Sequence, residues 1–238
     1  MLSTSVEDPP NANGDAGPVL ISHRHKFIYV KAPKTASTSI EVLFQRFCVP
    51  EDHEFIQAAS EEIVTEIGVV GARGVDVQGS TNFNHMTATQ IRNLHGADVW
   101  RNYFKFSVVR NPFDQAISYF LFSHRGQFDA QSTDHVLASF NLWVPKNLLP
   151  LKAFYCGNGE QLDLDFYIKY EALNDGIQFV ASQLGIKGLQ PTELQHLKRS
   201  DRSRLPATRD WFSRENAALI EQYYEWLLEA FGYSWSTT

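Results

Sequence analysis

Residues 27–48, FIYVKAPKTASTSIEVLFQRFC, contain the pattern that is most informative about the fold class. It opens with a short apolar run typical of a buried strand, continues through the polar segment APKTASTS, and ends in an amphipathic pattern typical of a helix. A strand, a loop and a helix in this order bring unpaired backbone N–H groups and the positive end of the helix dipole to one point. The stretch therefore predicts an anion-binding loop.

A second unit of the same kind lies at residues 104–123. FKFSVV, 104–109, predicts a buried strand, and Asn111 and Pro112 are typical of the cap and the first position of a helix. Two such units indicate an α/β fold with a central parallel sheet flanked by helices. The other expected elements are a helix capped by Thr87, short helices or a cap over a pocket within 130–160, a third strand in DFYIKY (165–170), and helices over about 174–185 and 213–231. Residues 68–84 are glycine-rich and predict a loop or a strand with long edges.

Composition excludes several classes of protein. The 238 residues carry 21 Lys and Arg against 27 Asp and Glu, a net charge of −6, which argues against a general nucleic-acid coat or a binder of anionic membranes.

Residues 1–22 are rich in Pro, Asn, Gly and Asp and predict a disordered tail before one domain over 23–238. No membrane span or targeting segment is evident, so we expect a soluble, cytoplasmic protein. Cys48 and Cys156 lie in no metal-like spacing and are expected to be buried thiols.

The first loop is dense in groups that could hold a phosphate. Lys34 adds a cation, and the hydroxyl donors are Thr35, Ser37, Thr38 and Ser39. In the alternative interpretation, Ser37 or Ser39 only caps the helix and Lys34 is solvated. The pattern GxxxxGK[ST] is absent, since no glycine occurs between Pro18 and Gly68, which disfavours an ordinary ATP or GTP site.

The second unit offers another anion site. Arg110 ends the strand, and Ser118 lies seven residues after Asn111, almost two helical turns on, so both can reach the same side. An arginine fork and a hydroxyl suit a dianionic phosphate monoester. Alternatively, Arg110 is buried and paired with Asp114.

Together the two motifs resemble a known family. PKTASTSI (33–40) is similar to the 5′-phosphosulfate loop, and VRNPFDQAISYF (109–120) to the 3′-phosphate motif, of sulfotransferases that use 3′-phosphoadenosine 5′-phosphosulfate (PAPS). FYIKYEAL (166–173) resembles the strand and turn that follow this motif, and EQYYEWLLEAFGY (221–233) the closing helix of the carbohydrate-type branch. The resemblance implies a P-loop NTPase-like three-layer fold, PAPS as sulfonate donor, adenosine 3′,5′-bisphosphate (PAP) as product, and no metal. The commonest family loop has glycine where Ala36 stands.

The resemblance also implies roles for individual residues. Lys34 would stabilise the leaving phosphate, the loop over Thr35, Ala36, Ser37, Thr38 and Ser39 would hold the 5′-phosphate, and Arg110 and Ser118 would bind the 3′-phosphate. The basic tract 196–214 has six Lys or Arg against two Asp. In the resembled family a basic segment near this point closes over the 3′-phosphate, and the candidates here are Lys198, Arg199, Ser200 and Arg202. A solvated basic face, or contact with an acidic acceptor, are the alternatives for this tract.

An acceptor hydroxyl needs a base, and histidine is the usual one. His85 is the first candidate, because NHMTATQIR (84–92) resembles the place where the carbohydrate-type branch carries its histidine base. The alternative is a loop histidine bonded to a backbone carbonyl. His124, on the helix after the 3′-phosphate motif, is the second candidate.

The expected function is sulfonate transfer from PAPS to a hydroxyl of a sugar or another small-molecule acceptor, without nucleic-acid or membrane partners. A nucleotide kinase or NTPase of similar fold is one alternative, which magnesium dependence would separate. A non-catalytic protein that binds adenosine bisphosphate is another. The sequence assigns no oligomeric state.

Overall fold

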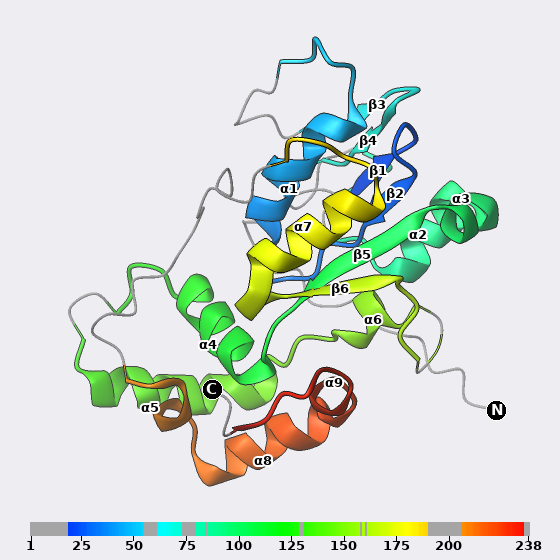
Figure 1. Cartoon of the computed structure of the whole chain (residues 1–238). Coiled ribbons are helices and arrows are strands. Elements are labelled where there is room, and N and C mark those ends of the chain that lie inside the picture. Colours follow the sequence, from blue (N-terminus) through cyan, green and yellow to red (C-terminus); the bar gives the residue numbers. More distant parts are fainter. Residues whose placement is uncertain are drawn as a thin grey trace, which may run out of the picture.

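The structure is a computed structural model that describes residues 19–54, 61–72, 80–83, 85–128, 131–157, 159, 161–189 and 206–235. These residues form a six-stranded sheet in the order β3-β4-β1-β2-β5-β6 (Figure 1). The strands are β1 (Leu20–Ser22), β2 (Phe27–Tyr29), β3 (Ile63–Val64), β4 (Gly68–Val70), β5 (Phe104–Val109) and β6 (Phe166–Lys169). The helices are α1 (Ser37–Phe44), α2 (Ala88–His95), α3 (Ala97–Asn102), α4 (Pro112–Ser123), α5 (Thr133–Trp143), α6 (Lys152–Tyr155), α7 (Leu173–Gln183), α8 (Arg214–Tyr223) and α9 (Glu225–Phe231). The predicted α/β class is confirmed.

Half of the sheet is parallel. β2 pairs with β5, and β5 with β6, in parallel register, as the strand–loop–helix pattern predicts. The other half, β1, β4 and β3, is antiparallel. The carboxyl ends of β2 and β5 are joined closely, because the Ser107 hydroxyl donates to the Val30 carbonyl at 2.6 Å. The two predicted anion loops therefore begin side by side.

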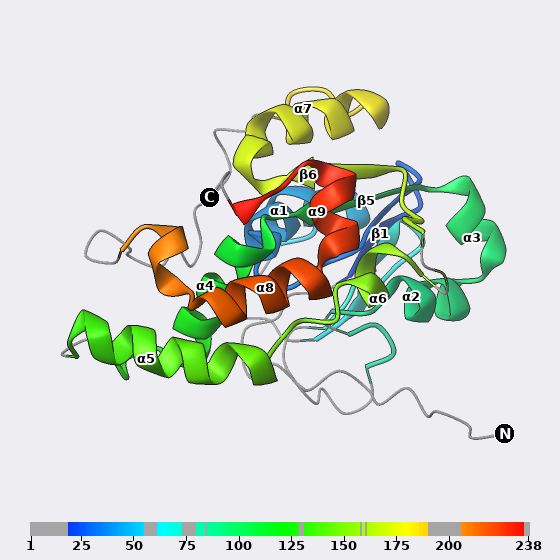
Figure 2. The same cartoon turned by 90° about the horizontal axis from the view of Figure 1, so that it is seen from below.

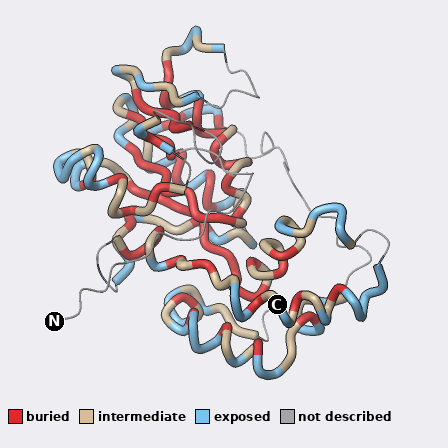
Figure 3. The backbone as a smooth tube through the Cα atoms, turned by 180° about the vertical axis from the view of Figure 1, so that it is seen from behind, coloured by how far each residue is buried: buried red, intermediate tan, exposed pale blue. Residues whose placement is uncertain are grey.

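The sheet is covered on both faces, which makes three layers. Phe27 and Tyr29 of β2 pack in one apolar cluster with α1 and α7, whereas Ile28 packs in the other with α2, α4, α6 and α8, because successive side chains of a strand point to opposite faces. Figure 2 shows α7 on one side of the sheet and α2 and α6 on the other. Figure 3 shows the buried segments running along the strands.

Local capping signals place the helices near the site as predicted. Thr87 forms a capping box with Gln90 at α2, and Asn111 accepts the Phe113 N–H at the start of α4, with Pro112 as its first residue. Residues 130–160 contain α5, α6 and a short 3-10 turn, Val144–Lys146, in keeping with the expected short helices. The helix predicted over 213–231 is two helices, and Tyr224 is the cap residue between the end of α8 and the start of α9.

The boundary of the predicted tail is wrong. Leu20–Ser22, assigned to the tail over 1–22, is the buried strand β1, which pairs with both β2 and β4. The approach of β4 is close: a Cβ on Gly68 would lie 2.1 Å from the Ile21 carbonyl oxygen, so this position requires glycine. Residues 1–18 lie outside the described residues.

Candidate active site

The loop between β2 and α1 has a strained backbone, and α1 begins without a side-chain cap. Lys34 (φ 61°) and Ala36 (φ 58°, ψ 22°) are both in the left-handed region, which non-glycine residues rarely adopt. Ala36 is the N-cap of α1 and provides no side-chain cap, so the interpretation in which Ser37 or Ser39 caps the helix is wrong. The Ser39 N–H donates to the Ala36 carbonyl at 3.0 Å, so the N–H groups of Ser37 and Thr38 are the ones that could bind an anion at the helix start.

The hydroxyls of the loop differ in their surroundings. Thr35 is fully buried and donates its hydroxyl to the Ala32 carbonyl at 3.0 Å, so it fixes the loop's own shape. Ser37 and Ser39 are buried in the first turn of α1, and Thr38 is partly exposed. Donors of this kind can complete the coordination of a phosphate that binds at the helix start.

Two side chains of the second motif hold the backbone of the loop, and Lys31, within the loop, is paired with α1. Gln115 of α4 is buried and donates Nε2 to the Pro33 carbonyl at 2.6 Å. Arg110 donates Nη1 to the Lys34 carbonyl at 2.9 Å. Lys31 forms a fully buried ion pair with Glu41 of α1, with 2.7 Å between Nζ and Oε2. The two phosphate motifs are therefore one structural unit.

Sequence reasoning missed the Lys31–Glu41 pair and the role of Gln115. A signal for the pair existed, because Lys31 directly follows the apolar run FIYV and Glu41 carries the only charge in the helix sequence STSIEVLF. The same region contains the Tyr29 hydroxyl, which is buried without a hydrogen-bond partner among the described residues. Burial, and next the Glu41 carboxylate, raise the pKa of Tyr29 well above its ordinary value, so this hydroxyl stays protonated.

Arg110 is buried at the end of β5 and has several partners. Its guanidinium pairs with Asp114, with Nε 2.5 Å from Oδ2, and stacks on Tyr170 at 4.0 Å from the ring centroid. The alternative in which Arg110 pairs with Asp114 is thus present in the structure, yet the same guanidinium also contacts the first loop. Ser118 lies on the middle of α4 and is partly exposed.

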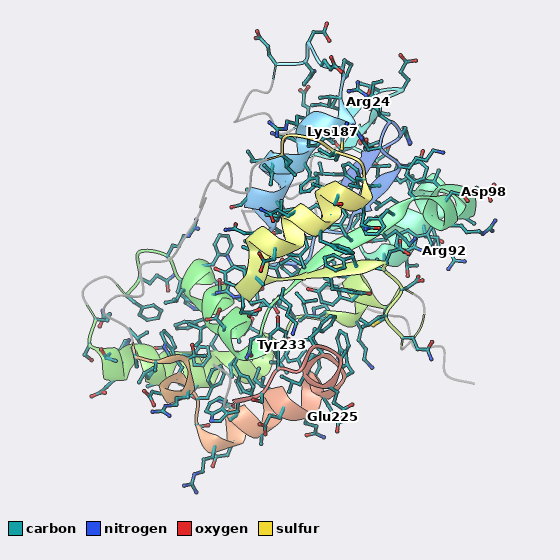
Figure 4. The ribbon with its side chains drawn as sticks, viewed as in Figure 1. Arg24, Arg92, Asp98, Lys187, Glu225 and Tyr233 are labelled. Carbon is teal, nitrogen blue, oxygen red and sulfur yellow. The ribbon has the colours of Figure 1, made fainter. Side chains whose placement is uncertain are left out.

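The carboxy-terminal segment packs against this second motif. Tyr233, which Figure 4 labels between β6 and α9, donates its hydroxyl to Glu171 at 2.7 Å, and the same carboxylate accepts the Asn111 N–H at 3.2 Å. Burial, and next the bonded Glu171, raise the pKa of Tyr233, so it remains a donor. These contacts fix the start of α4.

His85 lies beside the first loop. Its Nδ1 is 2.9 Å from the Lys31 carbonyl, and its ring meets Phe154 edge-on at 6.2 Å. A carbonyl can only accept, so Nδ1 carries the proton and Nε2 carries the lone pair of the neutral ring. This bond agrees with the alternative interpretation, in which His85 is a loop histidine bonded to a backbone carbonyl. The same bond is compatible with a role as base, because it leaves Nε2 as the nitrogen that accepts a proton.

His124 has different surroundings. Its Nδ1 is 2.9 Å from the Phe120 carbonyl of its own helix, and its ring packs with Phe120, Phe128 and Trp143. The structure brings His85 to the loop and places His124 in an aromatic cluster at the end of α4. The remaining candidates, Lys198, Arg199, Ser200 and Arg202, lie outside the described residues.

An open cavity of about 460 Å³ lies elsewhere. Its lining includes Arg92, Trp100, Lys105 and Asp165, near the residues that begin β5, and Figure 4 labels Arg92 there. The Lys105 ammonium is paired with Asp165 at 2.7 Å. The loop and Arg110 lie at the opposite end of the parallel strands, so this cavity is not part of the candidate site.

Comparison with known proteins gives one family. The sequence model described as the sulfotransferase family matches residues 18–234. No curated protein and no solved structure matches the chain significantly. Among the described residues, no helix is long and apolar enough to cross a membrane. The match spans nearly the whole chain and includes both phosphate motifs, and the chain therefore belongs to the sulfotransferase family and is a PAPS-dependent enzyme.

Proposed function

We propose that the enzyme transfers the sulfonate of PAPS to a hydroxyl of a sugar or another small molecule, with Lys34 and His85 as catalytic residues. One observation carries the proposal: His85 and the second phosphate motif, which are distant from each other in sequence, both contact residues 31–34. His85 bonds to the Lys31 carbonyl, and Arg110 bonds to the Lys34 carbonyl. The candidate base His85 and the 3′-phosphate candidate Arg110 therefore both bond to the short backbone segment that carries the loop cation, Lys34.

The described residues fit a nucleotide with a 5′-phosphosulfate and a 3′-phosphate. The uncapped start of α1 and the hydroxyls of Ser37 and Thr38 would hold the 5′-phosphate, and the Lys34 ammonium would lie near the sulfonate. The guanidinium of Arg110, with the Ser118 hydroxyl, would take the 3′-phosphate. Asp114 keeps the Arg110 fork oriented by its ion pair, at the cost of competing with that phosphate.

The chemistry divides between two residues. The acceptor oxygen forms a bond to sulfur while the bond from sulfur to the bridging phosphate oxygen breaks, so an acceptor proton must leave and negative charge must go to the bridging oxygen. His85 would take the proton at Nε2, because Nδ1 is engaged with the Lys31 carbonyl. Lys34 would neutralise the charge on the departing oxygen. PAPS supplies an activated sulfonate.

Substitution of each candidate base and of the lysine tests this assignment. We expect Lys34→Ala and His85→Ala to lower turnover by roughly 10²- to 10³-fold, since each removes one transition-state interaction. His85→Ala should keep its affinity for PAP, because in the proposed mechanism the ring takes the acceptor proton and does not hold the nucleotide. The matched control is His124→Ala, for which we expect turnover near that of the parent enzyme.

Two outcomes would contradict the assignment. Near-normal turnover of Lys34→Ala would remove Lys34 from the mechanism, and loss of turnover in His124→Ala but not in His85→Ala would make His124 the base. Metal-independent turnover stays a prediction, and full activity in the presence of EDTA would confirm it. A dependence on magnesium would favour the kinase or NTPase alternative instead.

A further inference from the structure

Both ends of Lys34 are held by residues of the second strand–loop–helix unit, 104–123. Arg110, after β5, donates to the Lys34 carbonyl at 2.9 Å. The Lys34 ammonium lies over the ring of Phe122, in the last turn of α4, with Nζ 3.6 Å from the ring centroid. An ammonium at this distance is attracted by the negative face of the ring. The place of the ammonium is therefore determined by α4 as well as by the loop.

Phe122 differs from its neighbours on α4 in what it packs against. Phe120 is fully buried in an apolar cluster, and Tyr119 and Leu121 pack against the same cluster. Among the described residues, Phe122 belongs to neither apolar cluster, and its ring contacts two cations. An aromatic residue at this position is thus not explained by core packing.

The second cation on the ring is Arg125, in the turn after α4. Its Cζ lies 4.4 Å from the ring centroid, and its side chain is otherwise exposed. The ring thus gathers two positive charges close to the loop. Two like charges held near one another attract an anion more strongly than either alone, so this arrangement favours a negatively charged ligand at the loop.

We propose that Phe122 is a positioning residue for Lys34, whose ring confines the ammonium beside the loop before the donor binds. This proposal rests on the proposed function. A lysine side chain is a flexible four-carbon stem, and ordering it on binding lowers affinity and rate. A ring that already holds the ammonium reduces that loss. Removal of the ring should therefore lower the rate only because the Lys34 ammonium is no longer held in place.

Five variants test the proposal. Phe122→Leu removes the aromatic face and Phe122→Trp retains it. The matched control is Phe179→Leu, a partly exposed phenylalanine on α7 that stacks on Phe166. The remaining two are Lys34→Met alone and Phe122→Leu combined with Lys34→Met. Transfer from radiolabelled PAPS gives kcat/KM for the donor, and the Cε protons of ¹³C-labelled lysine, assigned by loss of the signal in Lys34→Met, report the ring directly.

We expect Phe122→Leu to lower kcat/KM by about five- to twentyfold and to remove an upfield ring-current shift of the Lys34 Cε protons. Phe122→Trp and Phe179→Leu should keep both properties. In the Lys34→Met background, Phe122→Leu should change the rate less than about twofold, because the two residues act through one contact.

An unchanged kcat/KM or an unchanged Lys34 shift in Phe122→Leu would overturn the proposal while leaving the sulfotransferase assignment intact. An equal loss in the Lys34→Met background would do the same, since Phe122 would then act without Lys34. A parent enzyme that neither binds PAP nor turns over PAPS would overturn the proposed function and this proposal together, even with the upfield shift present.

Discussion

The buried ion pair between Lys31 and Glu41 holds the start of the phosphate loop against α1, and removal of either partner should destabilise the protein. The two side chains are 1% and 0% exposed, and their charged atoms are 2.7 Å apart. Removal of one partner would leave an uncompensated charge in a dry site, which destabilises a protein by about 3–5 kcal/mol. Replacement of both by apolar residues of similar size removes both charges, and such replacements are often neutral or stabilising.

We therefore expect Lys31→Met and Glu41→Leu each to lower the free energy of unfolding by about 3–5 kcal/mol, and the double variant to be more stable than either single one. A loss of this size is a large part of the roughly 5–15 kcal/mol that stabilises a typical domain. Urea unfolding, followed by fluorescence, measures all three variants.

An exposed ion pair nearby provides the control. Arg24 and Glu51 are 3.4 Å apart, with side chains 31% and 90% exposed, so Arg24→Met should cost less than about 1 kcal/mol. A loss in the single variants of the buried pair no larger than that of Arg24→Met would contradict this expectation. A loss in the double variant equal to the sum of the two single losses would also contradict it, because the charges would then not compensate one another.

Three further predictions concern the loop, the second motif and a titrating histidine. Ala36→Gly relieves a left-handed backbone but adds unfolded-state entropy, so the free energy of unfolding should change by less than about 1 kcal/mol, whereas Ala36→Val should lose more than about 1 kcal/mol; equal urea midpoints would contradict this. Arg110→Ala should weaken binding of PAP at least about tenfold more than binding of adenosine 5′-phosphate, and equal losses in calorimetry would make Arg110 purely structural. Burial, and next the charge of His23, lower the pKa of His95 below its ordinary 6.5. As the pH falls through 6.5, the unfolded chain takes up a proton on His95 before the folded protein does, so the free energy of unfolding should fall as well. The fall should be shallower in His95→Asn, and an unchanged slope would contradict this.

Much of the fold follows from local patterns. The strands at 27–29, 104–109 and 166–169 and the caps at Thr87 and Asn111 are encoded by short apolar runs and by single polar residues at helix starts. Strand β1 is different, because three residues after a polar segment carry little signal alone. It is stabilised by pairing with both β2 and β4, and Gly68, the residue of β4 that approaches it most closely, is distant in sequence.

The candidate site likewise combines residues that local patterns predict with contacts that they do not. The loop cation and the hydroxyls can be found from residue type and order, as can Arg110. The bond from His85 to the Lys31 carbonyl spans 54 residues, so no local pattern predicts it. The ion pair of Arg110 with Asp114 is one of two alternatives that the sequence leaves open. The contact between Lys34 and Phe122 depends on the angle between a loop and a helix, which no local pattern specifies.

We expect the joined loops of β2 and β5 to form a site for a nucleotide with both a 5′- and a 3′-phosphate. Calorimetry in the absence of magnesium, with PAP, ATP and adenosine 5′-phosphate as ligands, measures this selectivity. Binding of PAP should be clearly tighter than binding of either other nucleotide. Preference for ATP, or no binding of PAP, would contradict it.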